Sequence, residues 1–300
     1  MYSIFVFGLL PESSGKTVIS SALARGMVNR GIRTEVFKPR SGHSFWYQYD
    51  VLLECKKEER LFCEDIIKLK SACRSPLPAE ILNPVDALMS PLNVKEFLKR
   101  NTINMLYLLE QDTFLHMIAE RYTIICKGEI QNILCINTRS LKSRFVIADL
   151  EYIRRLEKSA DRVLYINSLD EWNNVFKCYS QEAISSCYQR VSEKADYVIV
   201  EGFNDAVCPE KSLQYDLVIG VAPGVSIFYD AEAFHEVLET LESLGKDPRN
   251  LRAEDVLKYL KKKKTLSIPA LPSPYLKDYD RLSEKLAPLV DLTLKLTDRS

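Results

Sequence analysis

The residues best suited to chemistry lie near the start of the chain, in the stretch GLLPESSGKT at positions 8–17. A short apolar run, Ile4 to Phe7, comes before this stretch and predicts a buried strand. An apolar-periodic segment follows it and predicts a helix. Loop N–H groups and the positive end of a helix together bind phosphate. We therefore predict a phosphate site, in which Lys16 reaches the outer phosphates and the Thr17 hydroxyl contacts a magnesium ion.

The spacing within this loop departs from the usual phosphate-loop pattern, GxxxxGK(S/T). Leu10 stands where that pattern has a glycine, and the available glycine is Gly8. The competing interpretation is an ordinary helix start that Ser14 caps. The order of strand, loop and helix favours the phosphate site. The residues that we assign to it are Ser13, Ser14, Gly15, Lys16, Thr17 and Val18.

Two acidic residues could complete a metal site. Residues 196–202, DYVIVEG, predict a strand that ends at Glu201, and an acid there is typical of the carboxylate that faces magnesium. The alternative is a buried structural acid, which needs a partner because an unpaired buried carboxylate is costly. Asp50 begins a predicted helix over 50–62, either as a magnesium ligand or as a carboxylate that stabilises the helix dipole.

A polar segment, KPRSGH at 38–43, follows a predicted strand over 33–38, and we expect it to be a loop. Loops at the carboxyl ends of strands face the ligand crevice in open α/β sheets. A solvated turn is the alternative interpretation. The residues that we assign to a second substrate, three from this segment and one from the loop after 196–202, are Lys38, Arg40, Ser41 and Asn204.

The composition excludes several classes of protein. The 300 residues contain 41 basic and 41 acidic side chains, so the charge gives no reason to expect a nucleic-acid or membrane partner. No apolar run approaches a membrane span and no signal peptide is recognisable, so we expect a cytoplasmic protein. The eight cysteines form no CxxC pair and only three histidines are present, so we expect reduced thiols rather than a zinc site.

The order of predicted elements indicates an α/β fold in a single domain over 1–300. Proline punctuation predicts a long loop over 71–94, and the pattern changes over 101–170, which we interpret as an insertion or sheet extension. Within that region we expect a hairpin of 123–126 and 132–137, strands over 145–148 and 162–167, and a helix over 150–158. Helices are expected over 94–100, 180–194, 231–244, 251–263 and 282–294, and further strands over 216–221 and 267–272.

The motifs together resemble the dethiobiotin synthetase-like branch of P-loop nucleoside triphosphatases, which includes the cobyrinic acid a,c-diamide synthase ATPase domains. The matching pieces are GKT after the first strand, KPRSG after the second, Asp50-Val-Leu, NP…SP within 82–91 and VEG at 200–202, with APG and IPALP loops later in the chain. The resemblance implies a three-layer P-loop fold, a mostly parallel sheet with helices on both faces.

The resemblance also implies a chemistry and a residue for each role. That family uses Mg²⁺ and ATP to phosphorylate a small carboxylate or carbamate; GTP is the alternative nucleotide, and a homodimer is implied. Lys16 and Lys38 would be catalytic, and magnesium would lie among Thr17, Asp50 and Glu201. Lys38 and Ser41 would face the acidic substrate. The residues near the base would be Pro269, Ala270 and Leu271.

Departures from the family keep two other functions open. The phosphate loop is one residue longer than the family's, KPRSG is one residue shorter than KPxxSG, and the asparagine that reads adenine has no clear counterpart. A regulatory or assembly ATPase or GTPase that acts on a protein partner is the first alternative. The second is a non-catalytic nucleotide-binding module.

Overall fold

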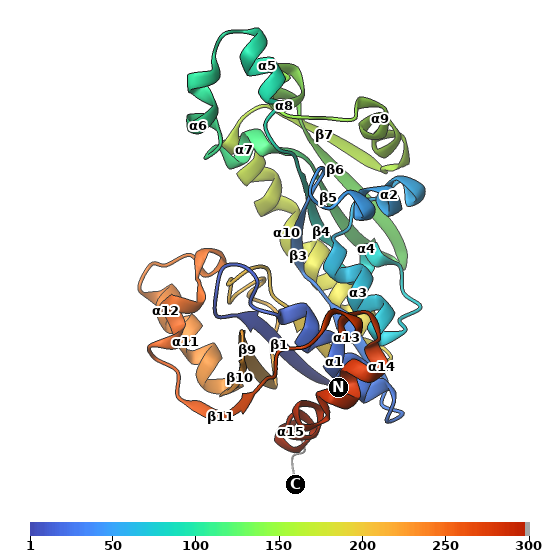
Figure 1. The fold of residues 1–300 in the computed structure, drawn as a ribbon, viewed down its shortest axis with the longest axis vertical. Helices are drawn as coiled ribbons and strands as arrows, with labels where there is room; N and C mark the ends of the chain where they lie inside the picture. Colours follow the sequence, from blue (N-terminus) through green and yellow to red (C-terminus); the bar gives the residue numbers. More distant parts are fainter. Residues whose placement is uncertain (298–300) are drawn as a thin grey trace. The chain divides into compact units, whose positions relative to one another are not determined.

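The chain folds into two compact units in the computed structural model, which describes residues 1–297 (Figure 1). The first unit contains Met1–Arg40, Asp65–Pro78 and the residues from Tyr188 onward. The second contains Ser41–Glu64 and Ala79–Cys187. Each unit has its own sheet.

The first unit is built on a six-stranded mixed sheet with the strand order β11-β10-β9-β1-β8-β2. Strands β9, β1, β8 and β2 are parallel, whereas β10 is antiparallel to both β9 and β11. The parallel strands are apolar and buried because both of their faces are covered. Their bounds are β1 Tyr2–Gly8, β2 Thr34–Phe37, β8 Tyr197–Glu201, β9 Leu217–Ala222, β10 Val225–Asp230 and β11 Lys262–Ser267.

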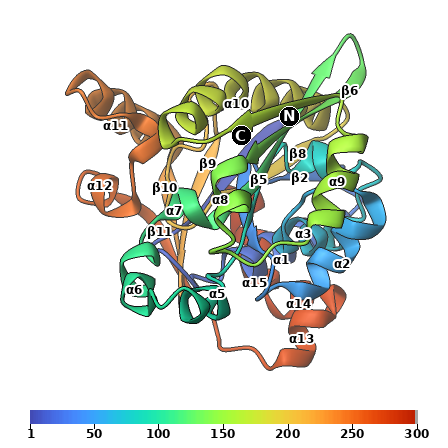
Figure 2. The same ribbon diagram turned by 90° about the horizontal axis from the view of Figure 1, so that it is seen from above.

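Helices cover both faces of this sheet (Figure 2). On one face, α11 (Ala231–Ser243) places Phe234 against the rings of Phe5 and Phe7. On the other, α1 (Lys16–Val28) contacts α14 (Tyr279–Lys285) and α15 (Ala287–Thr297). Gly26 permits this approach, because a Cβ there would lie 2.6 Å from the Val290 side chain. The remaining helices with residues in this unit are α3 Glu64–Cys73, η2 Pro248–Asn250, α12 Ala253–Leu257, α13 Ser273–Lys277 and the end of α10, Leu169–Ser192.

The second unit has a five-stranded sheet with the order β3-β4-β5-β6-β7. Pairs β4–β5 and β5–β6 are antiparallel and β6–β7 is parallel. The strands are β3 Arg40–Ser44, β4 Val85–Met89, β5 Met117–Cys126, β6 Glu129–Asn137 and β7 Arg162–Ile166. The helices are α2 Tyr49–Glu58, α4 Ala79–Leu82, α5 Val94–Lys99, η1 Ile103–Met105, α6 Leu106–Leu109, α7 Thr113–His116, α8 Thr138–Ser143, α9 Leu150–Ser159 and most of α10.

The α/β class predicted from the sequence is confirmed, with sheets that are more mixed than expected. The hairpin of 123–126 with 132–137 is confirmed as β5 and β6. Region 101–170 lies within the second unit, which also takes in residues on both sides of it. The single domain over 1–300 stays a prediction. None of the helices within residues 1–297 is long and apolar enough to cross a membrane.

Several local predictions were wrong. The expected loop over 71–94 contains α4 and β4, because its prolines fall between short elements rather than inside them. The segment KPRSGH is not a loop, since β3 begins at Arg40. The expected strand over 145–148 forms only an isolated bridge, Leu92 to Val146. The sequence reading also missed β10.

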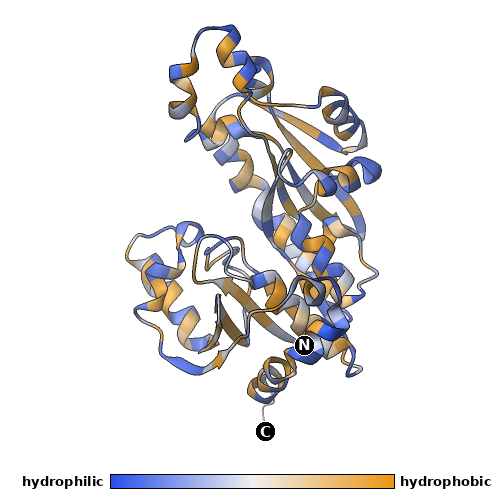
Figure 3. Cartoon of the chain, viewed as in Figure 1, coloured by the Kyte–Doolittle hydropathy of each residue, from blue (hydrophilic) through white to orange (hydrophobic). Residues whose placement is uncertain are grey.

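The expected helix over 251–263 ends early, at Leu257, and its lysines lie on a strand instead. Strand β11 begins at Lys262 and forms the edge of the first sheet, and its lysines are exposed. Figure 3 colours the chain by hydropathy, with lysines at the hydrophilic end of the scale. Charged side chains on an edge strand oppose pairing with other chains. The lysine run therefore protects an open sheet edge, rather than ending a helix as predicted.

Candidate functional site

The loop between β1 and α1 is held by its own backbone and by a close neighbour. A Cβ on Gly8 would lie 2.8 Å from the carbonyl oxygen of Asn204, so only glycine fits there. The Ser14 hydroxyl donates to the carbonyl of Leu10 at 2.8 Å. Ser13 and Gly15 have positive φ angles of 53° and 88°, which turn the chain into the helix. Left-handed backbone at Ser13 and Gly15 thus sets the direction in which the loop enters α1.

The backbone amides of residues 13–17 are available to a ligand. Among the described residues, none of them donates to a protein acceptor. They lie at the N-terminus of α1, which has no side-chain cap, and the helix dipole adds positive potential there. Alternating backbone conformations of this kind form concave anion-binding nests. The loop therefore offers donors and positive potential to an anion.

A polar centre lies beside this loop and consists of Thr17, Lys38, Asp65 and Glu201, which we call the lysine–carboxylate centre. The Lys38 ammonium lies 2.7 Å from Glu201 Oε1 and 2.8 Å from Asp65 Oδ2. The Thr17 hydroxyl lies 3.1 Å from Glu201 Oε1 and 3.1 Å from Asp65 Oδ1. One ammonium and one hydroxyl thus bridge two carboxylates.

The sheet explains how residues far apart in sequence meet here. Glu201 ends β8, and Lys38 follows the last residue of β2, the parallel neighbour of β8. Parallel strands end at the same edge, where α/β sheets bind ligands. Thr17 and Asp65 each lie in the first turn of a helix, α1 and α3. A carboxylate at a helix start is stabilised by the dipole.

Burial governs the charges in this centre. Glu201 is fully buried, and its second oxygen, Oε2, has no hydrogen-bond partner among the described residues. Burial acts to raise the pKa of Asp65, but the Lys38 charge and the hydrogen bonds from Lys38 and Thr17 outweigh it, so that the pKa is lowered. Burial lowers the pKa of Lys16, against the nearby charge of Glu201.

The donor set fits a hard cation. A threonine hydroxyl and two carboxylates are oxygen ligands of the kind that Mg²⁺ prefers, and Glu201 Oε2 has no hydrogen-bond partner within residues 1–297. Within residues 1–297 no group of three or more His, Cys, Asp or Glu side chains is placed to hold a metal. Magnesium commonly binds one or two carboxylates and takes its other ligands from phosphates and water. The residues therefore fit Mg²⁺ bound together with a phosphate.

Asp50 is not part of this centre. It lies in the second unit on α2, is exposed, and lines a shallow depression with Lys56, Lys57 and Arg155. The carboxylate that accompanies Thr17 and Glu201 is Asp65. Asp50 therefore fits the alternative interpretation, a first-turn acid on a helix dipole.

Ser41 and Lys38, which we expected to act together, belong to different units. Ser41 lies on β3 with its hydroxyl 2.5 Å from Asp86 Oδ1 and 3.0 Å from Asn83 Oδ1. His43 Nδ1 lies 2.7 Å from Asp86 Oδ2. These four residues form a second buried group, the histidine–aspartate cluster. Burial acts to lower the pKa of His43, but Asp86 outweighs it and raises the pKa to about 10.

The other predicted residues have varied surroundings. Half-buried Asn204 has a left-handed backbone, and its carbonyl lies beside Gly8. Arg40 is half-buried at the start of β3. Residues 269–271 follow β11, which is parallel to β9 through β10 and so ends at the same edge as β1. Pro269 and Ala270 are exposed there.

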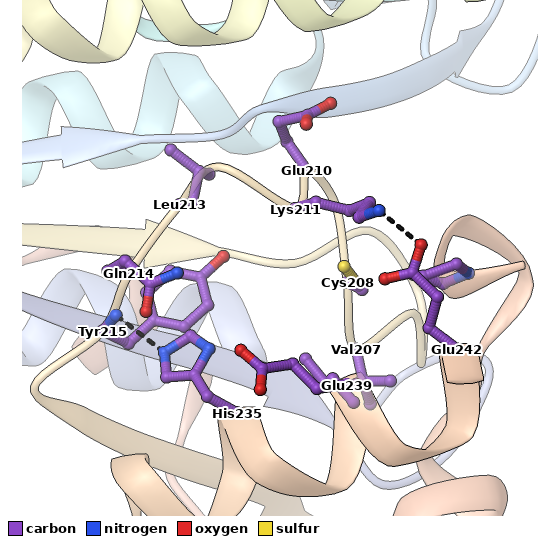
Figure 4. A pocket seen from close by; sticks show the side chains of 12 residues that line it. Val207, Cys208, Glu210, Lys211, Leu213, Gln214, Tyr215, His235, Glu239 and Glu242 are labelled. Atoms are coloured by element: carbon purple, nitrogen blue, oxygen red, sulfur yellow. Dashed lines mark hydrogen bonds and ion pairs between the residues drawn. The ribbon is translucent and has the colours of Figure 1, made fainter. Parts of the chain in front are cut away.

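A cavity of about 160 Å³ in the first unit was not expected from the sequence (Figure 4). It lies between α11 and the segment 207–215. His235 Nε2 accepts a hydrogen bond from the Tyr215 amide at 3.0 Å, and burial lowers the pKa of His235. Lys211 pairs with Glu242 at the rim. No motif marks these residues, because they meet only through the packing of α11.

Asp65 is the residue of the lysine–carboxylate centre that sequence reasoning missed. The signal available was an acidic pair, Glu64-Asp65, between an apolar LFC segment and the apolar-periodic IIKL. That pattern indicates a helix start, as the pattern at Asp50 also does, and does not say which helix approaches Thr17.

No protein-family model matches the chain, and comparison with the curated proteins finds no significant match.

Proposed function

We propose that this protein is a Mg²⁺-dependent P-loop nucleoside triphosphatase that resembles the ATP-dependent ligases of the dethiobiotin synthetase-like branch. The lysine–carboxylate centre is the observation that supports this proposal best. It places a hydroxyl, two carboxylates and an ammonium beside a loop whose amides lack protein acceptors. A purely structural ion pair would not need free amides or an unpartnered carboxylate oxygen beside it.

Each residue of the site has a role in this proposal. The amides of residues 13–17 and the ammonium of Lys16 bind the β- and γ-phosphates. Thr17, Glu201 and Asp65 hold Mg²⁺, directly or through water, and the ion when bound neutralises charge on the phosphate oxygens. Lys38 donates to the γ-phosphoryl group as charge develops on it during transfer.

The edge of the sheet also suggests where the nucleotide base and the second substrate would bind. Residues 269–271 leave the sheet three strands away from β1, or about 14 Å at the usual strand spacing. We assign to this loop the contact with the base of a nucleotide whose phosphates would lie at the loop after β1. A small carboxylate or carbamate is the proposed acceptor, because Lys38 is a cation at the reacting end of the site.

A nucleotide-dependent switch that acts on a protein partner is the second candidate. Exposed apolar side chains in the segment 98–108 of the second unit favour it, since exposed apolar patches commonly bind proteins. Leu98 is 62% exposed, Tyr107 79% and Leu108 71%. Phosphate release that rises with a small acid would support the ligase, and slow hydrolysis that a protein stimulates would support the switch.

Calorimetric titration with Mg²⁺ and non-hydrolysable analogues of ATP and GTP tests the site directly. We expect micromolar binding of one analogue to the wild type and at least a 100-fold loss in Lys16→Ala. Lys246→Ala is the matched control, because Lys246 is a surface lysine of the same unit that pairs with Asp255. Unchanged affinity in Lys16→Ala would show that the site is misplaced. No binding at millimolar ligand to folded wild type would reject the proposed function.

A further inference from the structure

The ammonium of Lys38 lies where a divalent cation would bind. Its nitrogen contacts Glu201 Oε1 at 2.7 Å and Asp65 Oδ2 at 2.8 Å, and the Thr17 hydroxyl faces the same two carboxylates. Magnesium takes oxygen ligands at about 2.0–2.1 Å. An ion bound to Thr17, Glu201 and Asp65 would therefore need the space that the ammonium fills, and the two cations would repel each other.

The ammonium is also needed where it is. Glu201 is 0% exposed and the Lys38 side chain is 3% exposed, so removal of the ammonium alone would leave a buried, uncompensated carboxylate. A lysine has a flexible stem and three donors, and it can exchange carboxylate partners for phosphate oxygens. The loop amides, which lie beside the centre, are where those phosphate oxygens would bind.

We infer that Lys38 takes the place of the divalent cation when no nucleotide is bound, so that metal and triphosphate must bind together. This inference rests on the proposed function, and it makes the binding of the metal and the binding of the triphosphate depend on each other. Metal alone has to displace Lys38 without offering it a new partner. When metal and triphosphate bind together, the phosphate oxygens would accept hydrogen bonds from Lys38 while the metal binds the two carboxylates.

The test is the affinity for Mn²⁺, measured by electron paramagnetic resonance with and without a non-hydrolysable nucleotide. We expect wild type to bind Mn²⁺ weakly alone and tightly with nucleotide. Lys38→Met should bind Mn²⁺ alone at least tenfold more tightly than wild type, because the carboxylates are left without their cation. Lys38→Arg keeps the charge and should resemble wild type.

Lys16→Met is the matched control, since it removes one positive charge from the same site without breaking a contact to Glu201 or Asp65. An equal gain in Mn²⁺ affinity in Lys16→Met and Lys38→Met would show that the loss of any nearby positive charge raises the affinity, and it would overturn the inference. Unchanged affinity in Lys38→Met would also overturn it. In either case nucleotide binding by wild type would leave the proposed function standing, and its absence would reject that function separately.

Thermal unfolding gives a second measurement that does not depend on Lys38→Met being fully stable. Mn²⁺ or Mg²⁺ without nucleotide should raise the melting temperature of this variant by several degrees and leave that of wild type unchanged. Lys38→Gln, which retains a donor, replaces Lys38→Met where that variant does not fold. The same rise in wild type and in these variants would contradict displacement by Lys38.

Discussion

The lysine–carboxylate centre and the histidine–aspartate cluster draw their cations from one short segment, KPRSGH, yet they differ in kind. In the lysine–carboxylate centre one ammonium serves two carboxylates, and Glu201 Oε2 has no partner among the described residues. In the histidine–aspartate cluster each carboxylate oxygen of Asp86 has a side-chain partner. The first also adjoins free backbone amides.

This difference distinguishes a candidate binding site, the lysine–carboxylate centre, from a structural polar cluster, the histidine–aspartate cluster. A buried carboxylate whose bonds are complete holds its neighbours and has nothing to offer a ligand, whereas one with an unfilled position beside an anion-binding loop can accept a metal and its phosphate. The four predictions below break or sharpen this distinction, in order of decreasing effect.

The largest effect concerns pH and the histidine–aspartate cluster. Because the pKa of His43 is raised from its ordinary 6.5 to about 10, His43 adds stability that is fully present below pH 6.5 and is lost as the pH rises to about 10. The loss amounts to at most about 5 kcal/mol. Urea unfolding at pH 6, 8 and 10 measures it. Asp86→Asn should remove most of this dependence, and a dependence that it retains would assign the effect to other groups.

Asp86→Ala should come next. It leaves the buried His43 without its carboxylate, and removal of one partner from a buried pair costs about 3–5 kcal/mol. Chemical denaturation at pH 7 measures the loss. Nucleotide affinity per folded molecule should stay within about twofold of wild type, because both carboxylate oxygens of Asp86 already have side-chain partners inside the cluster. A large loss of affinity would show that the cluster belongs to the site.

Glu201→Gln should affect the Mg²⁺ dependence of the site, whereas Asp86→Ala should affect stability. The glutamine keeps the shape of the side chain but binds Mg²⁺ poorly, so the Mg²⁺ requirement for turnover should rise at least tenfold. Nucleotide affinity without metal should change less. Activity measured against Mg²⁺ concentration, beside calorimetry in a chelator, separates these effects. An equal loss in both would indicate that Glu201 is only structural.

The smallest effect is expected for Ser14→Ala, which removes one hydrogen bond inside the loop. Stability should fall by about 1 kcal/mol, and nucleotide affinity by a few-fold because the loop becomes less ordered. Ser243→Ala, which removes a similar bond to Thr240 at the end of α11, is the control and should leave the affinity unchanged. Equal affinity in both variants would show that the loop does not depend on Ser14.

Local signals were enough to predict three of the four residues of the lysine–carboxylate centre. An apolar run, a glycine-containing loop and GKT specify the strand, loop and helix around Thr17, and an apolar run that ends in an acid specifies Glu201. These signals are local because neighbouring residues fix the turn and the helix start. The apolar character of β1 and β8 also agrees with their place as buried parallel strands.

Long-range packing decided the rest. Asp50 and Asp65 both look like helix-start acids, and only the tertiary fold brings Asp65 to Thr17. The polar neighbours of Ser41 predicted a loop, but Ser41 lies on a strand. Its hydrogen-bond partner Asp86 is 45 residues away in the sequence, so no local pattern reveals the contact. Buried polar strands such as β3 have no apolar alternation to reveal them.

The left-handed turn at Ser13 and the bond from Ser14 to Leu10 have one further consequence. They hold the loop in one conformation although its amides donate to no protein acceptor among the described residues. The entropy cost of ordering the loop therefore arises when the chain folds and not when a ligand binds. A triphosphate would bind to a loop that is already preorganised and would not have to order its backbone. We therefore expect association to be limited by diffusion and charge, with little ordering of the backbone.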